Sequence, residues 1–357
     1  MNQSHHNLKN MNRSKNVTLK SLSKQLGLHV STVSRVLNGT LDEAHTAASP
    51  ETIEKIRNLA TELNYQPNTL AKSLKTQKTQ VISVLVPKLS DLVLATIYEG
   101  IDAAATQYNY FTFVSNTNDH PENQKKLGEM ALSRKVDGLI IADTHINEQS
   151  SNSFLQELSS KEIPFILVSR KTENFISVTC NDYLGGELAA QHLISQGHRN
   201  IGVIAGEPFA STGIDRTQGF CDYCDKHGVT ISNKQIIHSG FDVNSGHQAG
   251  LKLLSTTDKP TAIFAVNDFI AIGLMGAIKK LGMTPGKDIA VIGFNNITLA
   301  EQLPIPLTTI ASPMYDMGYI AMELLIKRIK GEKIESIAME PKLFIRESTL
   351  NFDKFTN

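Results

Sequence analysis

Short apolar runs alternate with longer amphipathic stretches through most of the chain beyond residue 80. Seven of these runs have the length and composition of buried strands: VISVLV, YFTFVS, GLIIA, PFILVS, NIGVIAG, TAIFAVN and IAVIGFN. Helical segments such as 94–108 and 267–281 lie between them. Strands that alternate with helices are typical of parallel sheets covered on both faces, so the pattern predicts an α/β fold. Seven strands favour two sheets of about four strands each over one larger sheet.

Polar side chains follow several of these runs, at Asp91, Thr144, Arg170, Asn267 and Asn295. The carboxyl ends of parallel strands meet at one edge of a sheet, and α/β proteins bind ligands at that edge. We therefore expect two lobes, one on each sheet, with a ligand cleft between them.

The segment before residue 80 has helical rather than strand periodicity. Leu19, Leu22 and Leu26 lie on one helix face, and Gly27 interrupts the pattern just before a second short helix. Two short helices joined by about three residues that include a glycine are typical of a helix-turn-helix.

The second helix of this pair, within HVSTVSRVLNG, has an apolar stripe and a polar face. Val33, Val36 and Leu37 form the stripe. The other positions, with small or basic side chains, are Ser31, Thr32, Ser34, Arg35 and Asn38. A helix fits the major groove of DNA, where an arginine can bond bidentately to guanine and small side chains approach phosphates. A solvated amphipathic helix gives the same pattern, but the preceding turn favours DNA binding.

A third helix is predicted in SPETIEKIRNLATELNY, with Ser49 as its N-cap and Pro50 at the first helical position. Its apolar face would close a three-helix core: Ile53, Ile56, Ala60 and Leu63.

The stretch YQPNTLAKSLKTQKTQ predicts one further short helix, capped by Asn68 and carrying Leu70, Ala71 and Leu74. A helix of about eight residues is marginal in water, so we expect it to form on a partner. On DNA, a leucine can enter the minor groove and kink it. A plain interdomain linker explains the same residues.

The net charge of zero conceals an asymmetry, because residues 1–80 hold 11 basic and 5 acidic residues and the remainder holds 24 and 30. A basic end suggests contact with a polyanion, although a solvated basic tail has the same composition. The chain has three cysteines, no apolar run long enough to span a membrane and no signal-peptide core at its start, so we expect a reducing cytoplasm.

Ordered motifs over residues 17–350 resemble the lactose-repressor/galactose-repressor (LacI/GalR) family of bacterial transcription regulators. They are VTLKSLSKQLGLHVSTVSRVLNG, SPET, LNYQPNTLAKSL, VISVLVPKLSD, KVDGLIIAD, IPFILVSR, LISQGHRNIGVIAG, DRTQGF, FAVNDFIAIG, IAVIGFNN and PLTTI. The resemblance implies a three-helix helix-turn-helix domain and a two-lobed, periplasmic-binding-protein-like domain with parallel sheets. We expect a disordered tail over 1–16, the DNA-binding domain over 17–65, a hinge helix and linker over 66–80 and the effector and dimerisation domain over 81–350. Lobe 1 would comprise about 81–180 and 312–338, and lobe 2 about 181–311 and 339–350.

The resemblance also assigns roles to individual positions. In the DNA-binding part, Val30, Ser31 and Arg35 would contact bases, and the wider set of DNA contacts is Thr18, Thr32, Ser34, Asn38, Asn68, Ala71 and Leu74. The effector would meet Asp91, Arg170, Thr212, Arg216, Phe241, Asn267 and Asn295, with the Arg216 guanidinium holding sugar hydroxyls or a carboxylate.

Several positions depart from the family pattern. His29 stands where serine is the usual helix cap, and Asn295 where aspartate is frequent. SDLVLA lacks the aromatic residues that would stack on a hexose, and the loop TLDEAHTAA after Gly39 is about five residues longer than usual.

Other motifs carry no function in this interpretation. Cys221 and Cys224 form a C-x-x-C with His227 nearby, but they fall within a predicted helix, so we expect ordinary packing and no metal site. No phosphate-binding glycine loop is present, and the residues SHH at 4–6 are taken as tail. Met11 offers a second possible start of translation.

Three classes of function fit parts of the sequence. A solute-binding protein would share the clamshell but lack the helix-turn-helix, and an enzyme would show a nucleophile elbow, a metal cluster or a phosphate loop. A ligand-controlled DNA-binding regulator accounts for all the features. We therefore predict a homodimeric repressor of a carbohydrate-utilisation operon that binds a palindromic operator and a small sugar-like effector, without cofactor or membrane contact. The alternatives are a regulator with a purine, nucleoside or sugar-acid corepressor, or a solute-binding protein without a regulatory role.

Overall fold

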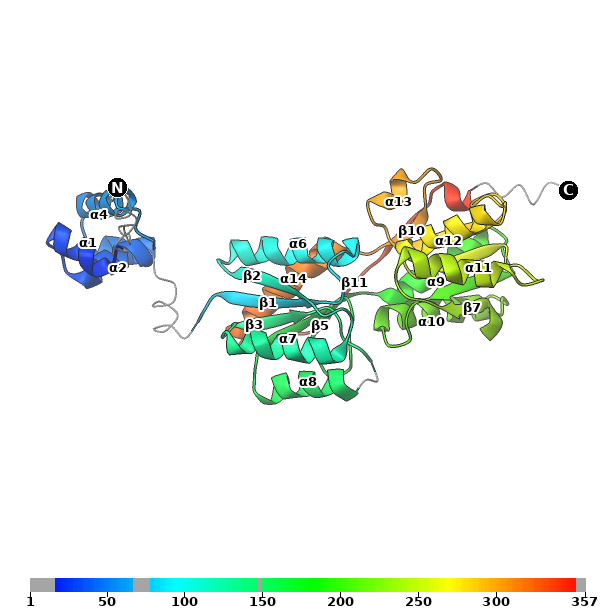
Figure 1. The fold of residues 1–357 in the computed structure, drawn as a ribbon, viewed down its shortest axis with the longest axis horizontal. Coiled ribbons are helices and arrows are strands. Elements are labelled where there is room, and N and C mark those ends of the chain that lie inside the picture. The colour runs from blue at the N-terminus through cyan, green and yellow to red at the C-terminus, as the bar shows by residue number, and fades with distance from the viewer. Residues whose placement is uncertain (1–16, 67–77, 147–148, 351–357) are drawn as a thin grey trace, which may run out of the picture. The chain divides into compact units, whose positions relative to one another are not determined.

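The computed structural model describes residues 17–66, 78–146 and 149–350. The chain divides into two compact units, residues 1–79 and 80–357. Figure 1 shows the elements of each unit, which are described separately.

The first unit is a small helical domain. Its helices are α1 (Leu19–Leu26), α2 (Val30–Asn38), α3 (Leu41–Ala47) and α4 (Pro50–Glu62). Gly27 closes α1 with φ 65°, a left-handed conformation that glycine adopts without strain, and this produces the turn into α2. The buried apolar side chains of the four helices form one core: Leu22, Val33, Val36, Ala44, Ile53, Ile56 and Ala60.

Helix α3 is an addition to the three helices expected here, since its residues were interpreted as a long loop. Thr40 and Glu43 form a capping box, in which each side chain accepts a hydrogen bond from the other residue's backbone N–H. Ala44 then packs into the core at 1% exposure. The capping box and the buried Ala44 methyl group therefore stabilise a short helix in the segment that was expected to be a loop.

The described residues of the second unit form two six-stranded sheets. The sheet of lobe 1 runs in the order β11-β5-β4-β3-β1-β2 and is parallel throughout. Its strands are β1 (Val81–Val86), β2 (Phe111–Asn116), β3 (Gly138–Ile141), β4 (Phe165–Val168), β5 (Ser177–Cys180) and β11 (Ile337–Met339).

The sheet of lobe 2 runs in the order β12-β10-β9-β8-β6-β7, and only its edge strand β12 is antiparallel. Its strands are β6 (Ile201–Ala205), β7 (Ile236–His238), β8 (Ala262–Ala265), β9 (Ala290–Asn295), β10 (Thr308–Ala311) and β12 (Lys342–Phe344). All seven apolar runs form strands as predicted, but the expectation of about four strands in each sheet is wrong. The additional strands have only three or four residues each, so they lack a clear sequence pattern.

Helices cover both faces of each sheet (Figure 1). In lobe 1, α6 (Leu92–Gln107) and α14 (Met314–Ile329) pack together on one face, and α7 (Pro121–Ser133) and α8 (Gln149–Ser160) cover the other. In lobe 2, the pair α9 (Asp182–Ser195) and α10 (Ser211–Lys226) lies opposite the pair α11 (Val243–Leu254) and α12 (Asp268–Lys280). The short elements η1 (Asn233–Gln235), α13 (Leu299–Gln302) and η2 (Glu347–Thr349) complete lobe 2.

The chain passes between the lobes at residue 181, at residues 312–313 and at residues 340–341. Two of these crossovers are tied together, because the Asn181 backbone N–H donates to the Met339 carbonyl over 2.7 Å. The crossovers leave the sheets at β5, β10 and β11, which lie at or next to one edge of each sheet. The lobes are therefore joined along one side, and their strands' carboxyl ends face the space between them.

Asp268 illustrates how lobe 2 stabilises a buried carboxyl group. Its oxygens accept hydrogen bonds from the Thr309 hydroxyl (2.6 Å) and the Ile297 backbone N–H (2.8 Å). The side chain is fully buried, and this burial raises the pKa of Asp268 to about 7 in spite of those bonds.

This raised pKa predicts a specific pH dependence of stability. The folded chain keeps the Asp268 proton up to about pH 7, whereas the unfolded chain loses it near its ordinary pKa of 3.8. The stabilisation is therefore complete below pH 3.8 and is lost as the pH rises towards 7. Between pH 5 and pH 8, this group should lower the free energy of unfolding by on the order of 2 kcal/mol. Urea unfolding of wild type and Asp268→Asn over this range measures the difference, and parallel pH profiles would contradict the assignment.

Candidate ligand cleft and nucleic-acid interface

A cavity lies between the lobes, where the ends of strands and the starts of helices from both sheets come together. Lobe 1 contributes Pro87, Asp91, Val93, Leu94, Ala142, Ser169 and Arg170. Lobe 2 contributes Thr212, Arg216, Phe241 and Asn295. A ligand bound there would contact both lobes at once, which couples its binding to their relative arrangement.

Six of the seven residues predicted to meet an effector line this cavity, and Asn267 does not. The Asn267 side chain is buried, where its carbonyl oxygen accepts from the Ile270 N–H (2.7 Å) and its amide donates to the Phe241 carbonyl (3.0 Å). It therefore caps α12 and positions Phe241. Ser169 and Ala142 line the cavity but were missed, because nothing in their local sequence distinguishes them from other residues at strand ends.

Arg216 is held by lobe 2 itself. Its Nε donates to Asp182 Oδ1 over 2.7 Å and its Nη1 to the Val266 carbonyl over 2.8 Å. The guanidinium carbon lies 3.7 Å from the centroid of the Phe294 ring, which adds a cation–π contact. Burial raises the pKa of Asp182, and the charge and hydrogen bond of Arg216 oppose that effect. The guanidinium charge is therefore balanced within the protein.

Arg170 is balanced in the same way within lobe 1. Its Nη1 and Nη2 donate to the two carboxylate oxygens of Asp119 over 2.6 and 3.0 Å, a bidentate geometry. The arginine is only 7% exposed, so its end of the ion pair is shielded from water, while Asp119 is partly exposed. Neither arginine of the cavity is left with an unpaired charge for an anionic ligand.

The cavity also contains the carboxyl group of Asp91, which forms no ion pair with either arginine. It caps α6, where its Oδ1 accepts from the Val93 N–H over 2.9 Å. Burial raises the pKa of Asp91, and the Val93 hydrogen bond and the charges of Arg170, Lys88 and Arg216 lower it by less. Hydrogen-bond donors on a ligand would therefore stabilise its ionised form.

Asn295 adds a second acceptor under strain. Its φ is 104°, in the left-handed half of conformational space that residues with a side chain rarely adopt. Its Oδ1 is buried and has no hydrogen-bond partner among the described residues. A buried acceptor without a partner costs about 1–3 kcal/mol, which a donor on a ligand would recover.

Phe241 reaches the cavity because Gly206 leaves space for it. A Cβ atom at position 206 would lie 2.3 Å from the Phe241 ring, so no larger residue fits beneath it. Phe241 thus provides the apolar wall in lobe 2, while Val93 and Leu94 provide it in lobe 1.

In the first unit, α2 presents the polar face that the sequence predicted. Ser31 and Arg35 are exposed, Val30 is 39% exposed, and Thr32, Ser34 and Asn38 are half-buried. Thr18 is exposed, but its side chain caps α1 by accepting from the Ser21 N–H.

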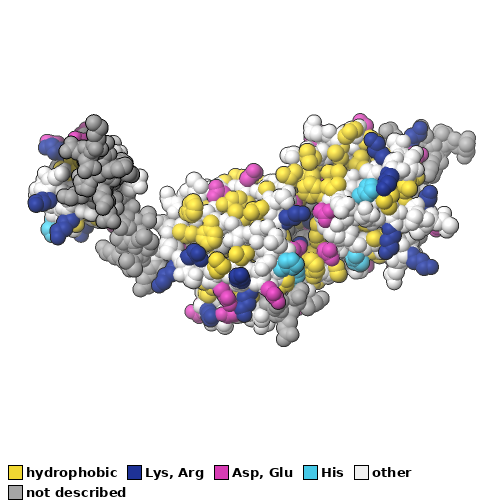
Figure 2. Space-filling model, in the orientation of Figure 1, with side chains coloured by type: hydrophobic (Ala, Val, Ile, Leu, Met, Phe, Trp, Pro, Cys, Tyr) yellow, Lys and Arg dark blue, Asp and Glu magenta, His cyan; other side chains and the backbone are white. Residues whose placement is uncertain are grey.

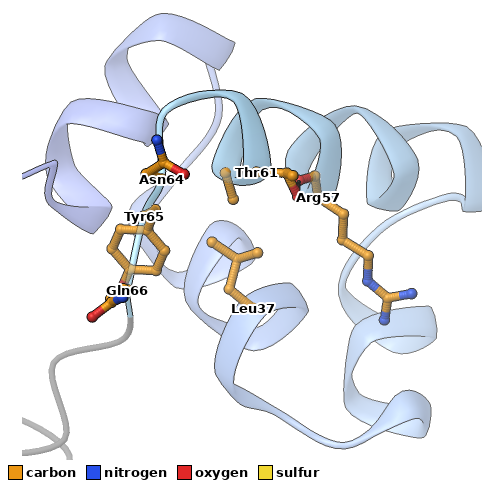
Figure 3. Close-up of a pocket in the computed structure, with 7 residues that line it drawn as sticks. Leu37, Arg57, Thr61, Asn64, Tyr65 and Gln66 are labelled. Atoms are coloured by element: carbon orange, nitrogen blue, oxygen red, sulfur yellow. Dashed lines mark hydrogen bonds between the residues drawn. The ribbon is translucent and has the colours of Figure 1, made fainter.

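Leu37 was assigned to the buried stripe with Val33 and Val36, and it is only half-buried. It lines a shallow groove between α2 and α4, with Thr61 and Tyr65 opposite and the Arg57 guanidinium pointing away (Figure 3). The groove is open to solvent on one side of the helical core.

His29 caps α2 despite being an unusual residue for that role. Its Nδ1 accepts a hydrogen bond from the Ser31 backbone N–H over 3.3 Å. The Ser31 hydroxyl lies 2.7 Å from the same Nδ1, and in the tautomer in which Nδ1 is the acceptor the hydroxyl donates to it. As a result, Ser31 Oγ presents only lone pairs to whatever lies outside the helix.

Asn68, Ala71 and Leu74 lie outside the described residues. Cys221 and Cys224 fall within α10, as predicted, and burial raises the pKa of their thiols to about 11 and about 12. Among the described residues there is no group of metal-ligating side chains, and no helix has the length and apolar character needed to cross a bilayer.

Comparison with known protein families agrees with this division into two units. Residues 18–68 match the family described as bacterial regulatory proteins, lacI family. Residues 190–349 match the periplasmic binding protein-like domain.

Curated relatives align with nearly the whole chain. The HTH-type transcriptional repressor PurR of Vibrio vulnificus is 32% identical over 93% of this chain and 98% of its own length. Catabolite control protein A of Priestia megaterium is 30% identical over 94% of this chain and 99% of its own length. The HTH-type transcriptional regulator DegA of Bacillus subtilis is 32% identical over 93% of this chain and 98% of its own length. These relatives are transcriptional regulators rather than enzymes.

Solved structures share the fold. The lac repressor dimer bound to operator and the anti-inducer ONPF has a TM-score of 0.84 at 26% identity, covering 94% of this chain and all of that one. The complex of the transcriptional regulator CelR with cellobiose has a TM-score of 0.70 at 27% identity, covering 93% and 99%. The predicted fold and family are thereby confirmed, and the chain belongs to the lacI family of bacterial regulatory proteins, as a DNA-binding transcriptional repressor with a ligand-binding domain.

Proposed function

We propose that the cleft binds a neutral or amine-bearing small molecule rich in hydrogen-bond donors, and that this effector controls operator binding. One observation carries the proposal: both arginines of the cavity are neutralised by carboxylates of the protein, Arg170 by Asp119 and Arg216 by Asp182. The charged group of the cavity left without an ion-pair partner is the Asp91 carboxylate, and Asn295 Oδ1 is a further acceptor without a hydrogen-bond partner among the described residues.

This charge balance separates the alternatives for the effector. A sugar acid or phosphorylated sugar would bring a negative charge next to Asp91, and the cavity lining offers no unpaired cation to receive it. A neutral sugar offers several hydroxyl donors, and a nucleoside offers hydroxyl and amine donors. The complex of CelR with cellobiose supports a neutral sugar. The name of the PurR relatives, which suggests a purine, supports a nucleoside. Phe241 is the aromatic residue in the cavity lining, and a sugar ring or a base could stack on it equally well. We favour a sugar-like effector and a carbohydrate-utilisation operon because of the likeness to the cellobiose-bound CelR.

The regulatory cycle follows from linkage between the two units. We propose that two chains associate through their second units, in the cytoplasm, and place two α2 helices in successive major grooves of a palindromic operator. The dimer of the lac repressor on operator DNA supports this arrangement. An effector with different affinities for two lobe arrangements shifts operator binding by that difference.

The first prediction concerns ligand class and Asp91. In a thermal-shift screen of the full chain, neutral sugars, amino sugars or nucleosides should raise Tm, whereas sugar acids and sugar phosphates should not. Replacing Asp91 by Ser keeps an N-cap residue on α6 but removes the carboxylate, and it should weaken binding of a neutral hit about tenfold.

Asp242→Ser is the matched control, because Asp242 caps α11 in the same way and does not line the cavity. It should leave the Kd of the hit unchanged. Stabilisation by sugar acids or phosphates alone would contradict the proposed ligand class.

The second prediction concerns Arg35 on the exposed face of α2. Arg35→Ala should weaken binding to an operator selected from random-sequence DNA by about 1–3 kcal/mol and relax base preference at one position. Lys55→Ala is the control, since Lys55 lies on α4 and pairs with Glu51 at 2.9 Å. Equal losses in both variants, measured by fluorescence anisotropy, would argue for general electrostatic attraction instead.

The third prediction concerns His29. With its hydroxyl proton engaged by His29, Ser31 Oγ can only accept, so it should favour a base with an exocyclic amine, adenine or cytosine. His29→Ser retains a helix cap but frees that hydroxyl, so selection from random DNA should show relaxed preference at one position of each half-site. If His29→Ser selects the same operator as wild type, Ser31 does not contact a base in this manner.

A further inference from the structure

A cluster of aromatic and charged side chains joins the two lobes beside the cavity, with Arg170 and Phe241 shared between the cluster and the cavity lining. Asp119, His145 and Arg170 follow β2, β3 and β4 of lobe 1. Phe209 precedes α10 and Phe241 precedes α11 in lobe 2. Figure 2 shows acidic, basic and histidine side chains gathered around the junction of the lobes.

The contacts across the junction are ring contacts. The His145 and Phe209 rings stack with their centroids 4.0 Å apart and their planes 17° apart. The Arg170 guanidinium carbon lies 5.6 Å from the centroids of both Phe209 and Phe241. Each such contact contributes roughly 0.5–1.5 kcal/mol when shielded from water, so together they are comparable to the free energies that separate lobe arrangements.

Asp119 holds the lobe 1 half of this cluster in place. It accepts hydrogen bonds from both Arg170 nitrogens and from His145 Nε2, the latter over 2.9 Å. Burial raises the pKa of Asp119, but the hydrogen bonds and charges of His145 and Arg170 outweigh it and hold that pKa well below its usual value. Asp119 therefore stays ionised and fixes the orientation of the His145 ring and of the Arg170 guanidinium.

Main-chain hydrogen bonds follow the same seam. The Ile146 N–H donates to the Phe209 carbonyl over 2.9 Å, and the Lys171 N–H donates to the Ser211 hydroxyl over 2.9 Å. The Lys171 ammonium also lies 2.7 Å from an oxygen of Asp215. Because the donors belong to lobe 1 and the acceptors to lobe 2, these amides report directly on whether the seam is closed.

The cluster also lies away from the covalent connections between the lobes. The crossovers leave the sheets at β5, β10 and β11, whereas the cluster comes from β2, β3 and β4 of lobe 1 and from the ends of β6 and β7 in lobe 2. In the sheet order of lobe 2, β6 and β7 are the strands farthest from β12 and β10. Opening the lobes about the crossovers would thus draw the lobe 2 side of this seam, at β6 and β7, away from lobe 1.

We propose that Asp119, His145 and Phe209 form a clasp that holds the lobes closed and positions Arg170 in the effector cleft. Phe209 and Asp119 do not line the cavity, so the clasp sets the balance between open and closed lobes without touching the effector. Its consequence for DNA binding rests on the proposed function above.

Hydrogen exchange of the full chain tests the clasp without any ligand or DNA. Phe209→Ala removes the stacked ring and leaves the backbone carbonyl, so the Ile146 and Lys171 amides should exchange about tenfold faster than in wild type. Sheet amides such as those of Ile140 and Phe264 should keep their wild-type rates. Phe269→Ala is the matched control, because Phe269 is half-buried in lobe 2 but packs on the core.

Wild-type exchange at Ile146 and Lys171 in Phe209→Ala, or equal acceleration in Phe269→Ala, would overturn the clasp. Asp119→Asn provides a second variant, which should accelerate the same two amides by loosening Arg170 and His145. For the functional step, Phe209→Ala should change affinity for the selected operator about fivefold or more, and Phe269→Ala should not. Faster exchange with unchanged operator affinity would refute the proposed link between lobe closure and DNA binding, not the clasp itself.

Discussion

The arrangement of the effector cleft depends on one buried ion pair, between Arg216 on α10 and Asp182 on α9. The same guanidinium bonds to the end of β8 and stacks on a ring from β9, so it joins four elements at the floor of lobe 2. A buried charge is tolerated only while its partners remain in place, which makes this floor resistant to partial rearrangement. Ligands therefore meet a preformed surface in lobe 2, and adjustment on binding has to come from elsewhere.

The second arginine of the cleft is constrained differently. Arg170 is paired with Asp119, whose side chain is 28% exposed, and its aromatic neighbours belong to the opposite lobe. One arginine thus fixes the interior of a lobe, while the other spans a junction between lobes. Both arginines are buried and neutralised, but their effects differ. Arg216 makes the lobe 2 side of the cleft rigid, whereas Arg170 makes contacts that break when the lobes separate.

Periodicity and strand order explain how much the sequence could predict. The seven strongly apolar strands and the helix-turn-helix were found because their patterns are local and regular. The ends of those strands led to Asp91, Arg170 and Asn295, since parallel strands bring their carboxyl ends together. Helix α3 was missed for lack of an apolar stripe, although the Thr40–Glu43 capping box was a usable signal.

Other parts of the site had no local signal. Asn267 was assigned to the ligand because a polar residue at a strand end and a helix cap look alike in sequence. Asp119, His145 and Phe209 were not singled out, because they come into contact only when segments far apart in the chain meet. Pairing across such distances depends on the tertiary fold, which spacing along the chain does not encode.

The order of the crossovers has a consequence for how the protein is made. Lobe 1 receives α14 and β11 from residues beyond 313, and lobe 2 receives β12 and the buried Ser348 and Thr349 near residue 350. Neither lobe can complete its core during synthesis until nearly all of the described chain has left the ribosome. The helical unit at the amino end has its whole core by residue 65, and domains generally fold as they emerge. A prematurely terminated chain would therefore carry a complete helical unit and two unfinished lobes.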